Sequence, residues 1–306
     1  MKICRHSLLK RFAVAISLTF ILVLGCGSAM AADRVKIALW GDSRENADHA
    51  VDQITDILLT KITDWDFTVH SGDFTHGGKD ADWQQSLAYP GISRLFVKDK
   101  FLMCTSNHDK KSAAWDKYTA GVLPVNSADG STHFCGFKVK NVHVVTCDPY
   151  FTKAAVMQSW LDEYLKGVQP GEWLIGVWHC PCYGDLTYKE DTLATAKPWL
   201  DSLYRHGCNF VLNGHAHVYL RTKPLAPDGS LDEAKGIIHV INGAGGATWK
   251  KPQPYTKKTA FTPKVTSFPA ITFLTFEGNT ATLQTIDARP GKNLAVIDEV
   301  QRAKNR

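Results

Sequence analysis

The stretch from Val35 to Asp42 reads VKIALWGD, an apolar run that ends in a glycine and an acidic residue. Val, Ile and Trp are favoured in strands, and Gly-Asp is typical of a turn. The stretch therefore predicts a buried strand over residues 35–40 and a loop that begins at Gly41. Apolar residues at helical spacing between Ile54 and Ile62 predict a helix after this loop.

The same pattern of a short apolar run, a polar loop and a helical segment recurs along the chain. Alternating strands and helices indicate a layered α/β architecture, in which two mixed sheets flanked by helices can face each other. A Lys-, Pro- and Thr-rich segment, Lys250–Lys264, is expected to be an exposed loop. The predicted strands cover residues 67–70, 100–104, 134–139, 142–146, 173–178, 210–212 and 237–241, the helices cover 156–165 and 194–206, and residues 271–297 form antiparallel strands with a turn at Gly278-Asn279.

Six polar residues of metal-ligand type follow five of these strands. The carboxyl ends of strands in an α/β sheet converge on one crevice, where ligands bind. Each residue alone has an ordinary structural explanation, such as a turn aspartate or a helix-capping asparagine. The combination of carboxylate, amide and imidazole groups at strand ends predicts a metal site instead. The six residues are Asp42, Asp73, Asn107, His179, His215 and His217.

The N-terminal segment has the features of a secretory signal. Its basic residues precede an apolar run, Phe12–Leu24, that is shorter than the ~20 residues that span a bilayer. Ala29-Met30-Ala31 matches a small-x-small cleavage site, so we expect residues 1–31 to be a signal peptide and residues 32–306 to be one domain. A bacterial lipobox ending at Cys26 is the alternative, in which Cys26 would carry a lipid anchor. Either route predicts export to the periplasm or secretion.

Export also changes what the charge and the cysteines mean. The leader holds four basic residues and no acidic one, so its removal lowers the net charge from +5 to +1. The mature chain therefore gives no charge-based support for nucleic-acid binding.

Six cysteines remain in the mature chain, which makes disulfides plausible in an oxidising compartment. Cys180 and Cys182 are interpreted as buried thiols or disulfides near the site rather than as a zinc motif.

The ordered blocks between Val35 and Gly246 resemble those of calcineurin-like metallophosphoesterases, and within them the purple acid phosphatases. The blocks are Gly41-Asp42, Gly72-Asp73, Asn107-His108-Asp109, Trp178-His179-Cys180-Pro181-Cys182-Tyr183, Gly214-His215-Ala216-His217-Val218-Tyr219 and Asn242-Gly243-Ala244-Gly245-Gly246.

The resemblance implies a four-layer αββα sandwich around two divalent or trivalent ions of Fe, Mn or Zn. Asp73 would bridge the ions, with Asp42 and His217 on the first ion. Asn107, His179 and His215 would bind the second. His108 would be the catalytic residue that faces the substrate and stabilises the transition state or protonates the leaving oxygen. A metal-activated hydroxide would be the nucleophile.

Two positions depart from the family pattern. Arg44 stands where most of the superfamily has a histidine, and it is expected to clamp a phosphate oxygen or form a surface ion pair. His76 stands where purple acid phosphatases have a tyrosine, and it is expected to be a metal ligand, with substrate contact or local packing as alternatives. Tyr183 is a further candidate for substrate binding.

The resulting expectation is an exported phosphoesterase that hydrolyses small phosphate monoesters. Phosphodiesters, such as cyclic nucleotides or glycerophosphodiesters, are the alternative substrates within the same chemistry. A metal-containing binding protein without turnover is the alternative from another class, and the presence of His108 counts against it.

Overall fold

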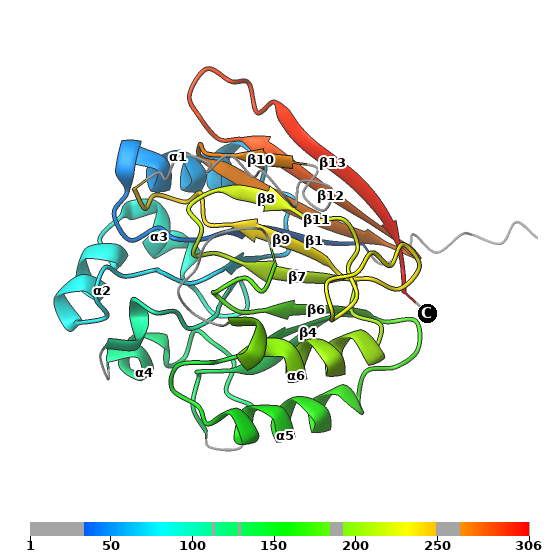
Figure 1. Cartoon of the computed structure of the whole chain (residues 1–306). Coiled ribbons are helices and arrows are strands. Elements are labelled where there is room, and N and C mark those ends of the chain that lie inside the picture. Colours follow the sequence, from blue (N-terminus) through cyan, green and yellow to red (C-terminus); the bar gives the residue numbers. More distant parts are fainter. Residues whose placement is uncertain (1–33, 112–113, 128–129, 184–191, 249–263, 306) are drawn as a thin grey trace, which may run out of the picture. The chain divides into compact units, whose positions relative to one another are not determined.

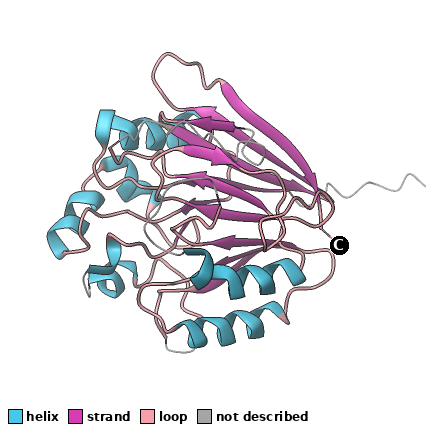
Figure 2. Ribbon diagram, viewed as in Figure 1, coloured by secondary structure: helices cyan, strands magenta, loops and turns pink. Residues whose placement is uncertain are grey.

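Two β-sheets packed face to face form the centre of the protein (Figures 1 and 2). The computed structural model describes residues 34–111, 114–127, 130–183, 192–248 and 264–305. All of them belong to one compact unit, Ala32–Arg306.

The first sheet has the strand order β13-β12-β11-β1-β2-β3. Its strands β1, β2 and β3 are parallel, whereas β11, β12 and β13 form an antiparallel extension that pairs with β1. The carboxyl ends of β1, β2 and β3 therefore lie at the same edge. The bounds are β1 Val35–Trp40, β2 Phe67–His70, β3 Phe101–Met103, β11 Ala270–Glu277, β12 Thr280–Asp287 and β13 Val296–Ala303.

The second sheet has the order β10-β8-β9-β7-β6-β5-β4. Here β5, β6, β7 and β9 are parallel, and β4, β8 and β10 are antiparallel to their neighbours. The bounds are β4 Cys135–Val139, β5 Val142–Thr146, β6 Trp173–Val177, β7 Phe210–Asn213, β8 Tyr219–Arg221, β9 Ile238–Asn242 and β10 Lys264–Thr266.

Helices cover the outer face of each sheet and complete four layers (Figure 1). One apolar cluster joins the first sheet to the helices α1 to α4, and another joins the second sheet to α5 and α6. The bounds are α1 Ala50–Asp56, α2 Asp80–Leu87, α3 Pro90–Leu95, α4 Ala114–Thr119, α5 Ala154–Leu165 and α6 Thr192–Arg205, with short helical turns η1 Ala47–His49, η2 Ile57–Lys61 and η3 Asp109–Lys111.

Strand β1 shows why the sequence gives this layering. Val35, Ile37 and Leu39 pack into the cluster between the sheets, whereas Ala38 and Trp40 pack against the helices. Side chains alternate between the two faces of a strand, so a strand that is apolar at successive positions has to be covered on both faces. Each large side chain buried in this way stabilises the fold by about 1.5–3 kcal/mol.

A polar contact also ties the two sheets together near the site. The Asn242 side-chain amide, at the end of β9, donates to the carbonyl oxygens of Leu39 and Ala270, each at 3.2 Å. Because β9 belongs to the second sheet and Leu39 to the first, this buried amide holds the carboxyl ends of β9 and β1 together.

The αββα sandwich predicted from the sequence is confirmed. Strands β1, β2 and β5 have the predicted bounds, and β4 and β5 form a hairpin that turns at Lys140, which has a φ of 52°. The short helices α2, α3 and α4, the strands β8 and β10 and nearly all of β13 were not predicted. These elements are three to eight residues long and carry too few apolar positions to define a period.

Several sequence predictions fall outside the described residues. They include the leader with Cys26, and the proposed loop Lys250–Lys264 except for Lys264, which begins β10. The six cysteines among the described residues are free thiols, and five of them are buried. Among the described residues, no helix has the length and apolar character needed to cross a membrane.

Candidate functional site

The site lies where the carboxyl ends of strands from both sheets meet. Asp42 follows β1, Asp73 follows β2 and Asn107 follows β3, all in the first sheet. From the second sheet, His179 follows β6 and His215 follows β7. The segment between β7 and β8 supplies His217. The structure therefore brings together all six residues that the sequence singled out.

One group of donors combines Asp42, Asp73 and His217, whose ligand atoms all lie within 4.8 Å of one another. The His217 Nε2 atom is 3.5 Å from an Asp42 carboxylate oxygen. The other ring nitrogen of His217, Nδ1, is 2.7 Å from the carbonyl oxygen of Thr248 and donates to it. This hydrogen bond fixes the tautomer, so the lone pair of Nε2 faces the carboxylates.

A second group is centred on His179 and His215. The His179 Nε2 atom is 3.2 Å from the His215 Nδ1 atom and 3.2 Å from an Asp73 carboxylate oxygen. Asn107 places its Oδ1 atom 3.1 Å from His215 Nδ1. The ring of His179 is oriented from behind by the carbonyl oxygen of Ser71, 2.7 Å from its Nδ1 atom. Asp73 thus contacts this group as well as belonging to the first.

Backbone geometry concentrates strain at these donors. Asp42, Asp73, His215 and His217 all have left-handed backbone, with φ values of 57°, 53°, 68° and 45°. Such a conformation costs on the order of 1–3 kcal/mol for a residue other than glycine, and it tends to occur at functional sites. The strained turns direct four donor side chains into one crevice, which is a feature that the sequence pattern did not predict.

Glycines make room for the Asp42 carboxylate. A β-carbon on Gly214 would lie 2.4 Å from the Asp42 Oδ2 atom, and one on Gly243 would lie 2.6 Å from the same atom. The backbone N–H of His215 donates to both carboxylate oxygens, at 3.0 and 2.9 Å. The Gly-His block after β7 and the glycine turn after β9 therefore form a closely fitted cradle for one carboxylate.

Burial and mutual proximity set the charges in the site. Burial and the neighbouring Asp73 carboxylate together outweigh the opposing effect of His179 and raise the pKa of Asp42 to about 8. For Asp73, burial is outweighed by His179, His108 and Arg44, which together hold its pKa below the usual range. Burial lowers the pKa of His179, but Asp73 and Asp42 raise it to about 9. Two buried carboxylates facing imidazoles form an environment that is stabilised by added positive charge.

The donor chemistry therefore fits metal ions. Carboxylate and amide oxygens combined with imidazole nitrogens suit zinc, iron and manganese. Cys180 adds a sulfur atom close to His179 and His215, and the hydroxyl of Tyr150 lies 3.1 Å from this sulfur.

The pocket at this centre has a volume of about 310 Å³. It is lined by Arg44, Asp73, Asn107, His108, His215, His217 and Thr248. The His108 Nδ1 atom is 2.5 Å from the carbonyl oxygen of His76 and donates to it, and His108 Nε2 lies 3.8 Å from an Asp73 carboxylate oxygen. Arg44 places its Nη1 atom 2.7 Å from the same oxygen, Oδ2. His108 and Arg44 thus lie beside the donors and line the pocket, and their contact with a substrate stays a prediction.

Two other predicted site residues lie elsewhere. The His76 side chain is 64% exposed and belongs to neither donor group; its nearest charged neighbour is Glu45, at 4.0 Å. Phe74 and Thr75 directly before it are fully buried, so exposure to solvent begins at His76. The hydroxyl of Tyr183 donates to the carbonyl oxygen of Pro227, and its ring packs edge-on against His239, so the structure does not bring Tyr183 to the pocket lining.

Asp109 is a positioning residue that the sequence analysis did not identify. Its buried carboxylate accepts hydrogen bonds from the Ser106 hydroxyl at 2.7 Å and from the backbone and hydroxyl of Thr75 at 2.9 and 2.8 Å. It thereby joins the loop that carries Asp73 to the loop that carries Asn107. The Ser-x-x-Asp spacing of Ser106 and Asp109 was the available signal.

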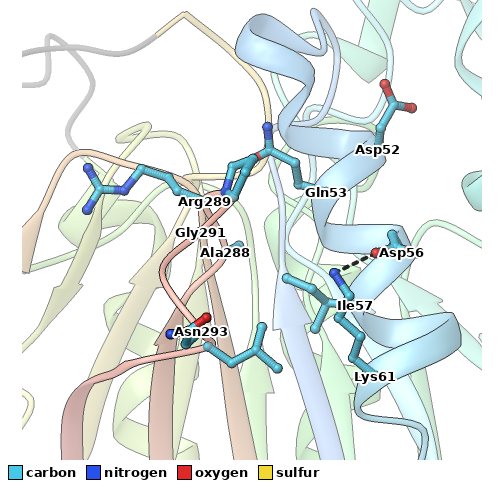
Figure 3. A pocket seen from close by; sticks show the side chains of 11 residues that line it. Asp52, Gln53, Asp56, Ile57, Lys61, Ala288, Arg289, Gly291 and Asn293 are labelled. Atoms are coloured by element: carbon cyan, nitrogen blue, oxygen red, sulfur yellow. Dashed lines mark ion pairs between the residues drawn. The ribbon is translucent and has the colours of Figure 1, made fainter.

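A second pocket lies away from this centre. It has a volume of about 490 Å³ and lies between α1, η2 and the loop Ala288–Leu294 (Figure 3). The ion pair drawn there joins Lys61 and Asp56 at 2.8 Å. No donor group of the kind described above lines this pocket.

Comparison with known proteins places the site in a family. The family model of calcineurin-like phosphoesterases matches residues 35–219, which include all six donors. The chain belongs to the calcineurin-like phosphoesterase family. Purple acid phosphatase 15 of Arabidopsis thaliana is 28% identical over 166 residues, which cover 51% of this chain and 31% of that protein.

Solved structures of this fold agree with the architecture. A purple acid phosphatase from yellow lupin (Lupinus luteus) seeds superposes with a TM-score of 0.73 at 14% identity, covering 90% of this chain and 54% of that one. GAP50, described as the anchor in the inner membrane complex of Plasmodium, superposes with a TM-score of 0.59 at 13% identity, covering 89% and 90%. At these identities the likeness shows the fold alone. The chain also spans only about a third of the Arabidopsis relative and about half of the lupin enzyme.

Proposed function

We propose that this calcineurin-like phosphoesterase is an exported, metal-dependent enzyme that hydrolyses small phosphate monoesters. The observation that carries the proposal is the convergence of six donors on one centre, whose pocket is lined by four of them together with His108 and Arg44. Similarity to purple acid phosphatases supports the choice of monoesters. The basic, apolar and small-residue pattern of residues 1–31 supports export, with lipidation at Cys26 as the alternative processing route.

The donors divide into two groups that share Asp73, which is the arrangement that two ions would need. His179, His215, Asn107 and Asp73 would hold one ion of Fe, Mn or Zn, and Asp42, His217 and Asp73 form the other group. Metal held there would supply Lewis acidity, polarising the phosphoryl oxygens and allowing water to attack near neutral pH.

The remaining chemistry comes from the side chains of the pocket. His108 is held by the hydrogen bond from its Nδ1 atom to the His76 carbonyl oxygen, so its Nε2 atom can donate a proton to the leaving oxygen when the ring is protonated. The guanidinium of Arg44 adds a fixed positive charge that stabilises the charge developing on the phosphoryl oxygens. Glycine cradles and buried hydrogen bonds hold these groups in place before the substrate binds.

The test is hydrolysis of p-nitrophenyl phosphate compared with bis-p-nitrophenyl phosphate by the purified chain. We expect turnover of the monoester that disappears after chelation and returns with Zn, Mn or Fe. Preference for the diester would move the function to a phosphodiesterase at the same site. A metal-loaded protein that turns over neither ester, nor any phosphorylated metabolite, would overturn the proposal in favour of a binding role.

A further inference from the structure

The geometry points to Arg44 as the resident cation of the group formed by Asp42, Asp73 and His217, so that the centre binds a single metal ion, at His179, His215, Asn107 and Asp73. The inference rests on the proposed function only in assuming that metal binds to the group of His179, His215, Asn107 and Asp73.

The Arg44 side chain uses the donor atoms that a first ion would need. Its Nη1 atom lies 2.7 Å from the Asp73 Oδ2 atom and 3.1 Å from the His217 Nε2 atom. Arginine is only a donor, so His217 Nε2 has to accept this hydrogen bond. The hydrogen bond from His217 Nδ1 to the Thr248 carbonyl oxygen selects the tautomer in which Nε2 can accept. The lone pair of His217 is therefore already directed at a cation.

The guanidinium is held in this position from its other side. The Arg44 side chain is 10% exposed, and its Nε atom lies 3.3 Å from a Glu45 carboxylate oxygen. Glu45 in turn accepts a hydrogen bond from the backbone N–H of Thr248 at 2.9 Å and another from its hydroxyl. Thr248 thus contacts both His217 and Glu45. This network fixes the position of the Arg44 guanidinium in the folded structure. A surface arginine without such contacts would instead sample several rotamers.

Charge favours one cation in this group over two. The buried carboxylates of Asp42 and Asp73 need a positive partner, and a guanidinium that cannot be deprotonated in proteins supplies it permanently. A divalent ion bonded to the same oxygen and nitrogen would need them at about 2.0–2.2 Å and would repel the guanidinium that already contacts both.

The second group offers a complete set of metal donors. Its ring nitrogens, His179 Nε2 and His215 Nδ1, are 3.2 Å apart. An Asn107 oxygen lies 3.1 Å from His215 Nδ1, and an Asp73 oxygen lies 3.2 Å from His179 Nε2. Two imidazole nitrogens combined with an amide and a carboxylate oxygen suit a metal ion.

Metal stoichiometry tests the inference without using activity. The purified full chain is loaded with Mn²⁺, dialysed, and measured by elemental analysis and by electron paramagnetic resonance. We expect one ion per chain with an uncoupled manganese spectrum. Removing the guanidinium, in Arg44→Ala and Arg44→His, should admit a second ion in at least one variant, with a spectrum of coupled ions. The exposed Arg94→His is the matched control and should keep one ion.

Each outcome separates the two proposals. Two ions in the unmodified chain would overturn the role of Arg44 and leave the phosphoesterase proposal intact. One ion in the unmodified chain and in both Arg44 variants would also overturn it, because the guanidinium would then not be what excludes the second ion. A chain that binds one ion but hydrolyses no phosphate ester would contradict the proposed function alone. If the Arg44 variants fail to fold, two ions in the unmodified chain still overturn the inference.

Discussion

The two sheets contribute different chemistry to the same centre. The first sheet supplies the oxygen donors Asp42, Asp73 and Asn107 together with the guanidinium of Arg44, whereas the second supplies the imidazoles of His179, His215 and His217. The first sheet therefore contributes carboxylate charge that has to be compensated, and the second contributes the imidazole nitrogens that suit zinc, iron and manganese. Neither half of the chain therefore contains a complete site, and the centre exists only because the two sheets pack face to face.

The largest expected loss of metal content and activity comes from removing a donor side chain, whichever sheet supplies it. In His215→Ala and in Asp73→Asn, metal content should fall, and kcat/KM for p-nitrophenyl phosphate should drop by more than about 100-fold, because even residues that only support metal ligands cost about 10–100-fold. Elemental analysis and steady-state kinetics measure both quantities. The exposed His49→Ala should behave as the unmodified chain. A fully metallated and active His215→Ala protein would show that the imidazoles of the second sheet do not hold the metal.

His108 is an exception to the division between oxygen groups on the first sheet and imidazoles on the second, because it is an imidazole that comes from the first sheet. Its replacement in His108→Asn should leave the metal content unchanged and lower kcat by about 100-fold for alkyl phosphates, whose leaving oxygen needs a proton. The effect should be smaller for p-nitrophenyl phosphate, whose leaving group departs as a stable anion. A plot of kcat against the pKa of the leaving group measures this difference. Equal losses for both substrates would contradict a role as general acid.

A smaller effect, on stability rather than on activity, is expected at the contact between β13 and β8. This contact joins the two sheets outside the donor groups. The Asp298 carboxylate of β13 accepts a hydrogen bond from the Tyr219 hydroxyl at 2.6 Å and a bidentate pair from Arg221 at 2.6 and 2.9 Å. Asp298→Asn should lower the free energy of unfolding by about 2–4 kcal/mol, since it leaves a largely buried guanidinium without its partner. Urea unfolding at pH 7 measures the loss, and kcat should not change.

Lowering the pH should remove the difference in the free energy of unfolding between the unmodified chain and Asp298→Asn. Burial opposes ionisation of Asp298, but Arg221 and Tyr219 outweigh it and lower its pKa. A lowered pKa gives stability that is present above the unfolded pKa of about 3.9 and is lost as the pH falls through the folded value. Asp56→Asn, which breaks the exposed pair with Lys61 in Figure 3, is the control and should cost at most about 1 kcal/mol. An equal loss in the two variants would show that the contact between the sheets adds nothing.

The sequence by itself determined the layered α/β fold and the six donors. Both depend on local order: apolar runs of strand length, and a polar residue placed just beyond each run, as in β1 and Asp42. The carboxyl ends of parallel strands share an edge, so residues at these positions converge without knowledge of the rest of the packing. Elements shorter than one clear period, such as α3 and β8, were beyond this reasoning.

Only the tertiary structure decided what the neighbouring polar residues do. Arg44 contacts Asp73 and His217, which are 29 and 173 residues away in the chain, and Tyr183 donates to Pro227, 44 residues away. His76, three residues after Asp73, remains exposed. Strand order and alternation fix where a backbone segment ends, but the direction of a side chain beyond that end depends on loop torsions and on partners from distant segments. Spacing along the chain therefore located the donors of this site, whereas the cation that compensates them was set by packing between the two sheets.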